Sequence, residues 1–131
     1  MPVIELPLDD SRYLTGLKSV IEELAASSSV VVRGRGSQFI LKNHANSTHV
    51  LLVAPMELRI RRVMETFNFD ERAAREEISF SDSSHREFIK KYFKADIEDP
   101  ENYDLVLNTG RISYENAATI VADAVRLSKQ T

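Results

Sequence analysis

Four short apolar runs along the chain predict buried β-strands. The three stronger runs are Val30–Val32, Val50–Val53 and Leu105–Leu107, and none of them alternates with polar residues. A weaker fourth run, Val3–Leu6, is bracketed by two prolines. Continuous apolar strands are typical of parallel sheets that are covered on both faces.

The segments between these strands carry apolar residues at helical spacing. Tyr13–Ala25 and Met56–Phe67 both show this repeat, and Pro55 is predicted to begin the second helix at its first position. Asp70 is predicted to open a long charged helix. A further helix runs from Asp82 to Phe93, either separate from the charged helix or continuous with it.

The order of these elements predicts the fold class. Ser113 is expected to cap a last helix, which follows the last strand. Strands that alternate with helices imply an α/β fold, in which a three-layer parallel sheet has flanking helices. With 131 residues, of which 43% are hydrophobic, the chain has the size of a single domain spanning residues 1–131.

Composition excludes several kinds of site. The net charge of -3 disfavours nucleic acid as a partner, and the absence of Cys excludes disulfides and thiolate metal sites. Three His at scattered positions show no metal-ligand spacing, so no metal site is assigned. No apolar run approaches the roughly 18 residues of a membrane span. The acidic start lacks the basic region of a signal peptide, so a cytoplasmic location without membrane contact is expected.

The turn after the second predicted strand is the first candidate for ligand contact. Gly34 and Gly36 would let the backbone approach a ligand, while Arg33 and Arg35 offer paired donors for phosphate or carboxylate. Ligands of open α/β sheets bind at the carboxyl ends of strands, which is where this turn lies. The alternative is a tight turn whose arginines are solvated.

The second candidate is an arginine cluster on the helix after the third strand. Arg59 and Arg62 are three residues apart and share a helix face, whereas Arg61 points elsewhere. The alternative interpretation is an amphipathic helix with a solvated basic face.

Two further candidates each have a structural alternative. Arg86 and Lys90, together with His85, form an anion-facing cluster by their helical spacing, and Asp82 before them is predicted to cap a helix. The polar residues Asn108–Gly110 end the last strand. They either line the ligand edge of the sheet or form a turn with capping residues.

Together, these motifs in this order resemble the cytidylate kinase-like family within the nucleoside monophosphate kinase superfamily. The segments that carry the resemblance are VVVRGRGSQFIL at 30–41, HVLLVAPMELRIRRVM at 49–64, the helix from Asp82 with FIKKYF, and YDLVLNTGRIS at 103–113. The resemblance covers about residues 13–128, which correspond to the carboxyl-terminal half of that family's kinase domain. It implies a P-loop kinase fold, ATP and magnesium as cofactors, and a pyrimidine monophosphate as acceptor.

The resemblance also implies roles for individual residues. Arg35 matches an arginine that contacts the acceptor nucleotide, and Asp82 matches an acidic residue that helps to hold the acceptor. Arg59 and Arg62 match arginines that face the donor phosphates at the start of the lid, which corresponds to residues 66–95. Residues 1–12 correspond to a relic or replacement of the first strand and its loop.

The sequence also departs from the family pattern. The arginine of the family's Asp-x-x-Arg motif falls on His85, and Arg86 is displaced by one position, which turns a helical side chain by roughly 100°. The acidic residue expected before Gly34 is Arg33. The sequence contains no G-x-x-x-x-G-K-[ST], the loop that cradles the transferred phosphates.

Three functions follow as hypotheses. In the first, the domain is not catalytic alone but retains nucleotide or phosphate binding. In the second, it is a non-catalytic regulatory or dimerisation domain on a kinase scaffold, and its incomplete sheet favours a homo-oligomer or a partner domain. In the third, which the net charge disfavours, it binds nucleic acid. No catalytic residue is assigned, and the predicted binding residues are Gly34, Arg35, Gly36, Arg59, Arg62, Asp82 and Arg86.

Overall fold

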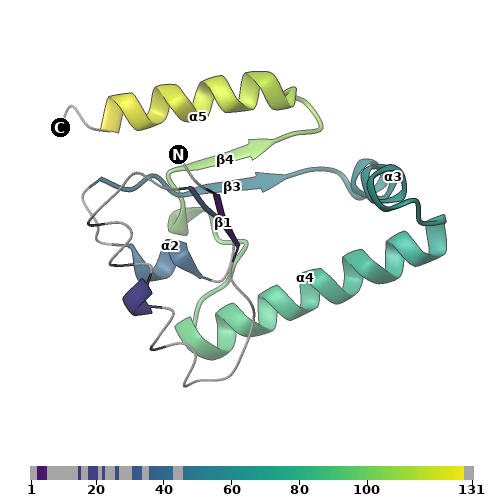
Figure 1. Ribbon diagram of the computed structural model, residues 1–131, viewed down its shortest axis with the longest axis horizontal. Coiled ribbons are helices and arrows are strands. Elements are labelled where there is room, and N and C mark those ends of the chain that lie inside the picture. Colours follow the sequence, from purple (N-terminus) through teal and green to yellow (C-terminus); the bar gives the residue numbers. More distant parts are fainter. Residues whose placement is uncertain are drawn as a thin grey trace. The chain divides into compact units, whose positions relative to one another are not determined.

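The computed structural model describes residues 3–5, 15, 18–20, 22, 26, 31–33, 36–42 and 46–128. It shows a mixed α/β fold that divides into two compact units (Figure 1). The first unit comprises Met1–Ser47 and His85–Glu98, and the second comprises Thr48–Ser84 and Asp99–Thr131. In the described part of the chain, no helix is both long enough and apolar enough to cross a membrane.

The first unit contains two of the predicted strands. Strand β1 (Val3–Glu5) pairs in parallel with β2 (Val31–Arg33), with Val3 opposite Val31. Both predicted strands are confirmed: β1 begins at the predicted residue and ends one residue earlier, and β2 is shifted by one residue from the apolar run. Of the predicted helix Tyr13–Ala25, the described residues 15, 18–20 and 22 are helical, and the others lie outside the described residues.

Gly36 has a packing role that the sequence pattern did not reveal. Its φ of 78° is left-handed, and it precedes the short helix α2 (Ser37–Ile40), which the sequence did not predict. A Cβ at this position would lie 2.3 Å from Cε2 of Phe93, whose ring stacks on Phe39 at a centroid distance of 5.2 Å. Gly34 and Arg35, the other candidate residues of this turn, lie outside the described residues.

The second unit contains the other two strands and the last helix. Strand β3 (Val50–Val53) pairs in parallel with β4 (Leu105–Asn108), and the 3-10 helix η1 (Pro100–Asn102) precedes β4. Figure 1 shows α5 (Tyr114–Ser128) running alongside β4. The predicted cap is confirmed, because Oγ of Ser113 accepts a hydrogen bond from the backbone N–H of Asn116 at 3.1 Å.

Helix α3 (Met56–Phe67) begins and ends where the apolar spacing predicts. Pro55, however, is the N-cap and not the first helical residue, because its ψ of 143° is extended. Asn68 ends the helix in a left-handed conformation, with φ of 56°. The carboxylate of Asp70 then accepts a hydrogen bond from the backbone N–H of Ala73 at 2.8 Å, which caps the next helix.

Helix α4 (Glu71–Phe93) is one continuous helix of 23 residues. Asp82 therefore lies in its interior, and the prediction that Asp82 caps a helix is wrong. The segment before Asp82 contains no Gly or Pro that would break the helix, and the helix is anchored on both sides of it by the buried residues Ile78 and Ile89.

A buried hydrophobic cluster of the second unit lies between α3 and α4. Ile60 of α3 packs with Ala74 and Ile78 of α4, and all three side chains are buried. Val63 and Met64 pack around them. Ala74 has no exposed surface, so a larger side chain there would push the two helices apart.

We predict that Gly36→Ala lowers the free energy of unfolding by about 2 kcal/mol, because alanine is strained at positive φ and its methyl group meets the Phe93 ring. Thermal and urea unfolding measure the loss. The double variant Gly36→Ala/Phe93→Leu should recover part of it, since the smaller side chain removes the clash but not the backbone strain. A single variant as stable as the unaltered protein would contradict this account.

Candidate functional site

The candidate site in the second unit is built around two arginines of α3. Arg59 and Arg62 are both half-buried, whereas Arg61 between them is exposed. The predicted shared face of Arg59 and Arg62 is thus directed toward the protein. Each of the two arginines makes a specific contact with another element of the same unit.

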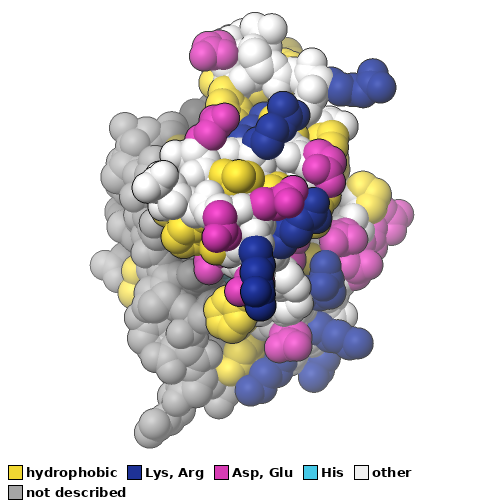
Figure 2. Space-filling view, turned by 90° about the vertical axis from the view of Figure 1, so that its right-hand side faces the viewer, with side chains coloured by type: hydrophobic (Ala, Val, Ile, Leu, Met, Phe, Trp, Pro, Cys, Tyr) yellow, Lys and Arg dark blue, Asp and Glu magenta, His cyan; other side chains and the backbone are white. Residues whose placement is uncertain are grey.

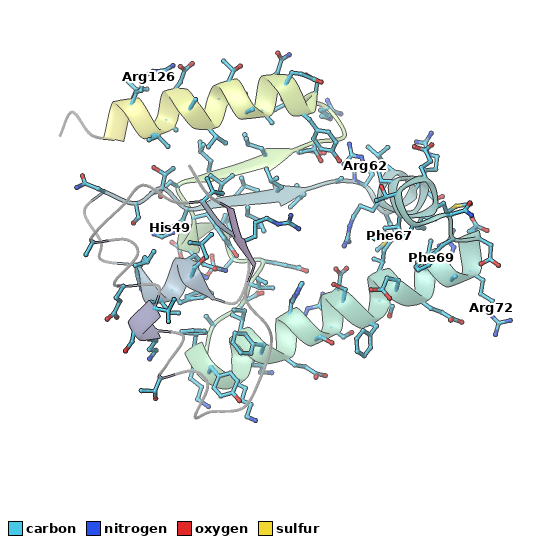
Figure 3. The ribbon with its side chains drawn as sticks, in the orientation of Figure 1. His49, Arg62, Phe67, Phe69, Arg72 and Arg126 are labelled. Carbon is cyan, nitrogen blue, oxygen red and sulfur yellow. The ribbon has the colours of Figure 1, made fainter. Side chains whose placement is uncertain are left out.

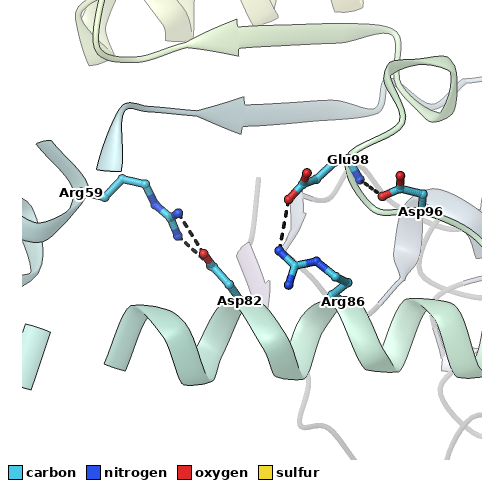
Figure 4. A network of polar contacts seen from close by, with 5 residues as sticks. All are labelled: Arg59, Asp82, Arg86, Asp96 and Glu98. Carbon is cyan, nitrogen blue, oxygen red and sulfur yellow. Dashed lines mark hydrogen bonds and ion pairs between the residues drawn. The ribbon is translucent and has the colours of Figure 1, made fainter. Parts of the chain in front are cut away.

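Arg59 forms a bidentate ion pair with Asp82 of α4 (Figure 4). Its Nη1 donates to Oδ2 at 2.9 Å and its Nη2 donates to Oδ1 at 2.7 Å. The side chains of Arg59 and Asp82 are 34% and 31% exposed, so solvent reaches the pair. Two parallel charge-assisted hydrogen bonds of this kind fix both side chains in direction as well as distance.

Arg62 reaches the end of strand β4. Its Nη1 donates to Oγ1 of Thr109 at 2.9 Å, and its Nη2 donates to the backbone carbonyl of the same residue at 2.8 Å. The guanidinium also lies 4.6 Å from the ring centroid of Tyr114. These partners are neutral, and no carboxylate of the described residues forms an ion pair with Arg62, so its charge is not cancelled within that part of the chain. Figure 3 shows Arg62 in this position, between α3 and the beginning of α5.

Thr109 is the residue that the sequence reasoning undervalued. It is buried, and its backbone N–H donates to the carbonyl of Val53 at 2.8 Å, which extends the pairing of β3 with β4 by one residue. The side chain of Asn108 accepts from the backbone N–H of Gly110 at 2.9 Å, as the turn alternative expects. The sequence feature that points to Thr109 is the polar run Asn108–Gly110, which directly follows the apolar strand.

Arg86 belongs to the first unit and has an acidic partner there. Its Nη2 lies 3.2 Å from Oε1 of Glu98, and both side chains are exposed (Figure 4). The backbone N–H of Glu98 donates to Oδ1 of Asp96 at 2.9 Å. Lys90, the other member of the expected anion-facing cluster, is also exposed. His85, which the sequence resemblance aligns with an arginine, is half-buried.

The acidic and basic side chains of the described residues are mixed, and no dense cluster of ligating side chains is found among them. Among them, no three His, Asp or Glu side chains gather closely enough to hold a metal ion. Figure 2 shows Lys and Arg side chains interspersed with Asp and Glu on the face that it presents. The described part of that face therefore shows no continuous basic stripe of the kind that follows a phosphate backbone.

We predict that Arg62→Lys lowers the free energy of unfolding by about 1–2 kcal/mol, because an ammonium cannot donate to both oxygens of Thr109 in the geometry of the guanidinium fork. Arg61→Lys is the matched control on the same helix and should change stability by less than about 0.5 kcal/mol, since its side chain is exposed. Urea unfolding compares the two. Equal effects of both substitutions would show that the Thr109 contacts do not stabilise the unit.

Proteins similar to this chain include a cytidylate kinase and a uronate isomerase. The chain is 27% identical over 124 residues to the cytidylate kinase of Staphylothermus marinus, a match that covers 95% of the chain and 64% of that protein. It is 31% identical over 99 residues to the uronate isomerase of Corynebacterium glutamicum, covering 76% of the chain and 19% of that protein. The chain thus spans less than two thirds of each of these two relatives.

A solved structure shares the fold. The crystal structure of an uncharacterized protein from Eubacterium ventriosum matches with a TM-score of 0.85 at 20% sequence identity, covering 95% of this chain and 82% of that one. The sequence pattern of the cytidylate kinase-like family matches residues 5–111 of the chain, a range that includes α3, α4 and β4. The chain belongs to the cytidylate kinase-like family.

Proposed function

We propose that this chain binds a nucleotide or another phosphate ester on a cytidylate kinase-like scaffold and that it does not transfer phosphoryl groups by itself. The proposal includes the finer fold that the sequence predicts, a three-layer parallel sheet with flanking helices as in P-loop kinases. The parallel pairing of β1 with β2 and of β3 with β4 supports that fold.

The observation that carries the proposal is the pair of half-buried arginines on one face of α3. This helix directly follows β3, and Arg62 reaches the residue after β4, so a guanidinium lies at the carboxyl ends of two parallel strands. Ligands of α/β sheets bind at this edge. The charge of Arg62 is not cancelled by its neutral partners, and it attracts anions to the site.

The missing phosphate cradle is the reason for expecting no transfer by this chain alone. In P-loop enzymes, backbone amides and a lysine of the G-x-x-x-x-G-K-[ST] loop hold the phosphates, and its hydroxyl helps to hold magnesium. The sequence contains no such loop. Phosphoryl transfer depends mostly on positioning and electrostatics, so arginines without this cradle support binding and not turnover.

The similarity to the Staphylothermus marinus cytidylate kinase supplies the ligand class to test. We predict that calorimetry detects binding of CMP, CDP or ATP and that Arg59→Gln weakens it about ten-fold, since a charge-assisted contact is lost. Arg61→Gln, an exposed neighbour, is the control and should change affinity by less than about two-fold.

Two results would contradict the proposal. The absence of both binding heat and a thermal shift at millimolar concentrations of all three nucleotides would exclude binding. Robust turnover in a coupled kinase assay would exclude the non-catalytic part of the proposal while leaving binding intact.

A second candidate function is a non-catalytic regulatory or dimerisation domain. It is favoured by the similarity to part of a protein named for a different activity, the uronate isomerase of Corynebacterium glutamicum. Large apolar side chains are also exposed in the second unit: Phe67 is 59% exposed and Phe80 is 72% exposed. Figure 3 shows Phe67 beside Phe69 near the junction of α3 and α4. Exposed aromatic groups of this kind favour association with a protein surface.

We predict for this candidate that the chain forms a homodimer in solution and that Phe80→Ser shifts it toward the monomer, because an exposed aromatic contact is lost. Light scattering coupled to size-exclusion chromatography measures the mass. Ser79→Ala, the adjacent exposed position on α4, is the control and should leave the mass unchanged. A monomer at all concentrations would exclude dimerisation by this chain.

A further inference from the structure

We propose that Asp82 is an internal plug: its carboxylate occupies the guanidinium fork of Arg59 and is displaced when a phosphate group binds there. This inference rests on the proposed function, because it concerns the same anion site. It gives Asp82 a role opposite to the one that the family resemblance implies, in which this residue helps to hold the acceptor.

The carboxylate of Asp82 binds the guanidinium of Arg59 in the same bidentate geometry as a phosphate group would. Two oxygens of Asp82 accept from Nη1 and Nη2 of Arg59 at 2.9 and 2.7 Å, and two oxygens of a phosphate group match the same fork. About one third of each side chain is exposed, so a ligand can approach the pair from solvent. The carboxylate and a phosphate group therefore compete for the same donors of Arg59.

The position of Asp82 in α4 supports a role outside helix formation. Asp is unfavourable in a helix interior and favourable at an N-cap, but the structure places Asp82 inside a continuous helix of 23 residues. Its side chain is instead directed to Arg59, 23 positions earlier in the chain. Helix propensity disfavours Asp at this position, and the ion pair with Arg59 is the interaction that its carboxylate makes there.

The contrast between the two arginines shows what the plug does to the site. Asp82 cancels the charge of Arg59, whereas the neutral groups of Thr109 and Tyr114 leave the charge of Arg62 in place. Arg62 attracts an anion, and the anion then displaces the carboxylate of Asp82 and binds Arg59. A ligand with more negative charge than a carboxylate, such as a diphosphate, wins this competition most easily.

Calorimetry with inorganic pyrophosphate at low salt tests the plug. Asp82→Asn should bind pyrophosphate roughly three- to ten-fold more tightly than the unaltered chain, because the competing charge is gone. Glu76→Gln is the matched control: it also removes one carboxylate from α4, but Glu76 is 70% exposed and pairs with Arg72. It should change affinity by less than about two-fold. The double variant Arg59→Gln/Asp82→Asn should lose the gain.

A second measurement needs no variant at position 82. In the unaltered chain, the side-chain carboxyl-carbon NMR signal of Asp82 should move as pyrophosphate is added, because the carboxylate leaves the fork. An unmoved signal at saturation would overturn the plug even if Asp82→Asn failed to fold.

The outcomes separate this inference from the proposed function. If the unaltered chain binds but Asp82→Asn binds more weakly, or gains no more than Glu76→Gln, the plug is wrong and anion binding stands. If pyrophosphate and all three nucleotides give no heat with the unaltered chain or with Asp82→Asn, the proposal of anion binding is wrong, and the proposed role of Asp82 is wrong as well.

Discussion

The packing of α3 against α4 is the constraint on which the candidate site depends. Ala74, which has no exposed surface, lets the two helices approach closely, and Ile60 and Ile78 fill the space beside it. Arg59 directly precedes Ile60, and Asp82 lies one helical turn beyond Ile78. The apolar contact therefore determines which polar residues meet at its margin.

Magnitudes show that the apolar contact, and not the ion pair, holds the two helices together. Burying an isoleucine side chain contributes about 1.5–3 kcal/mol, and Ile60 and Ile78 are both almost fully buried. A partly exposed ion pair contributes about 0.2–1 kcal/mol. The helices thus stay packed whether or not Arg59 is paired with Asp82, so this carboxylate is able to exchange with a ligand without unfolding the site.

The sequence predicted elements well where the signal is local. The apolar runs located all four strands to within about one residue, and the spacing of Met56–Phe67 located α3, because burial on one face produces these periods directly. Local rules misassigned Asp82, since a capping residue type is also found inside a helix when a distant partner engages it. The role of Gly36 was missed for the same reason: its contact with Phe93 joins segments far apart in the sequence.

The candidate residues were found more readily than their partners. Spacing alone placed Arg59 and Arg62 on one helix face, but Arg62 meets Thr109, 47 positions away, through a contact that only the fold creates. Arginines at the carboxyl ends of strands are interpreted as ligand-binding residues, yet here both are already satisfied by the protein. A ligand that displaces Asp82 from Arg59 must compensate for the lost ion pair with its own contacts. Its affinity therefore depends on how much more negative charge it carries than a carboxylate.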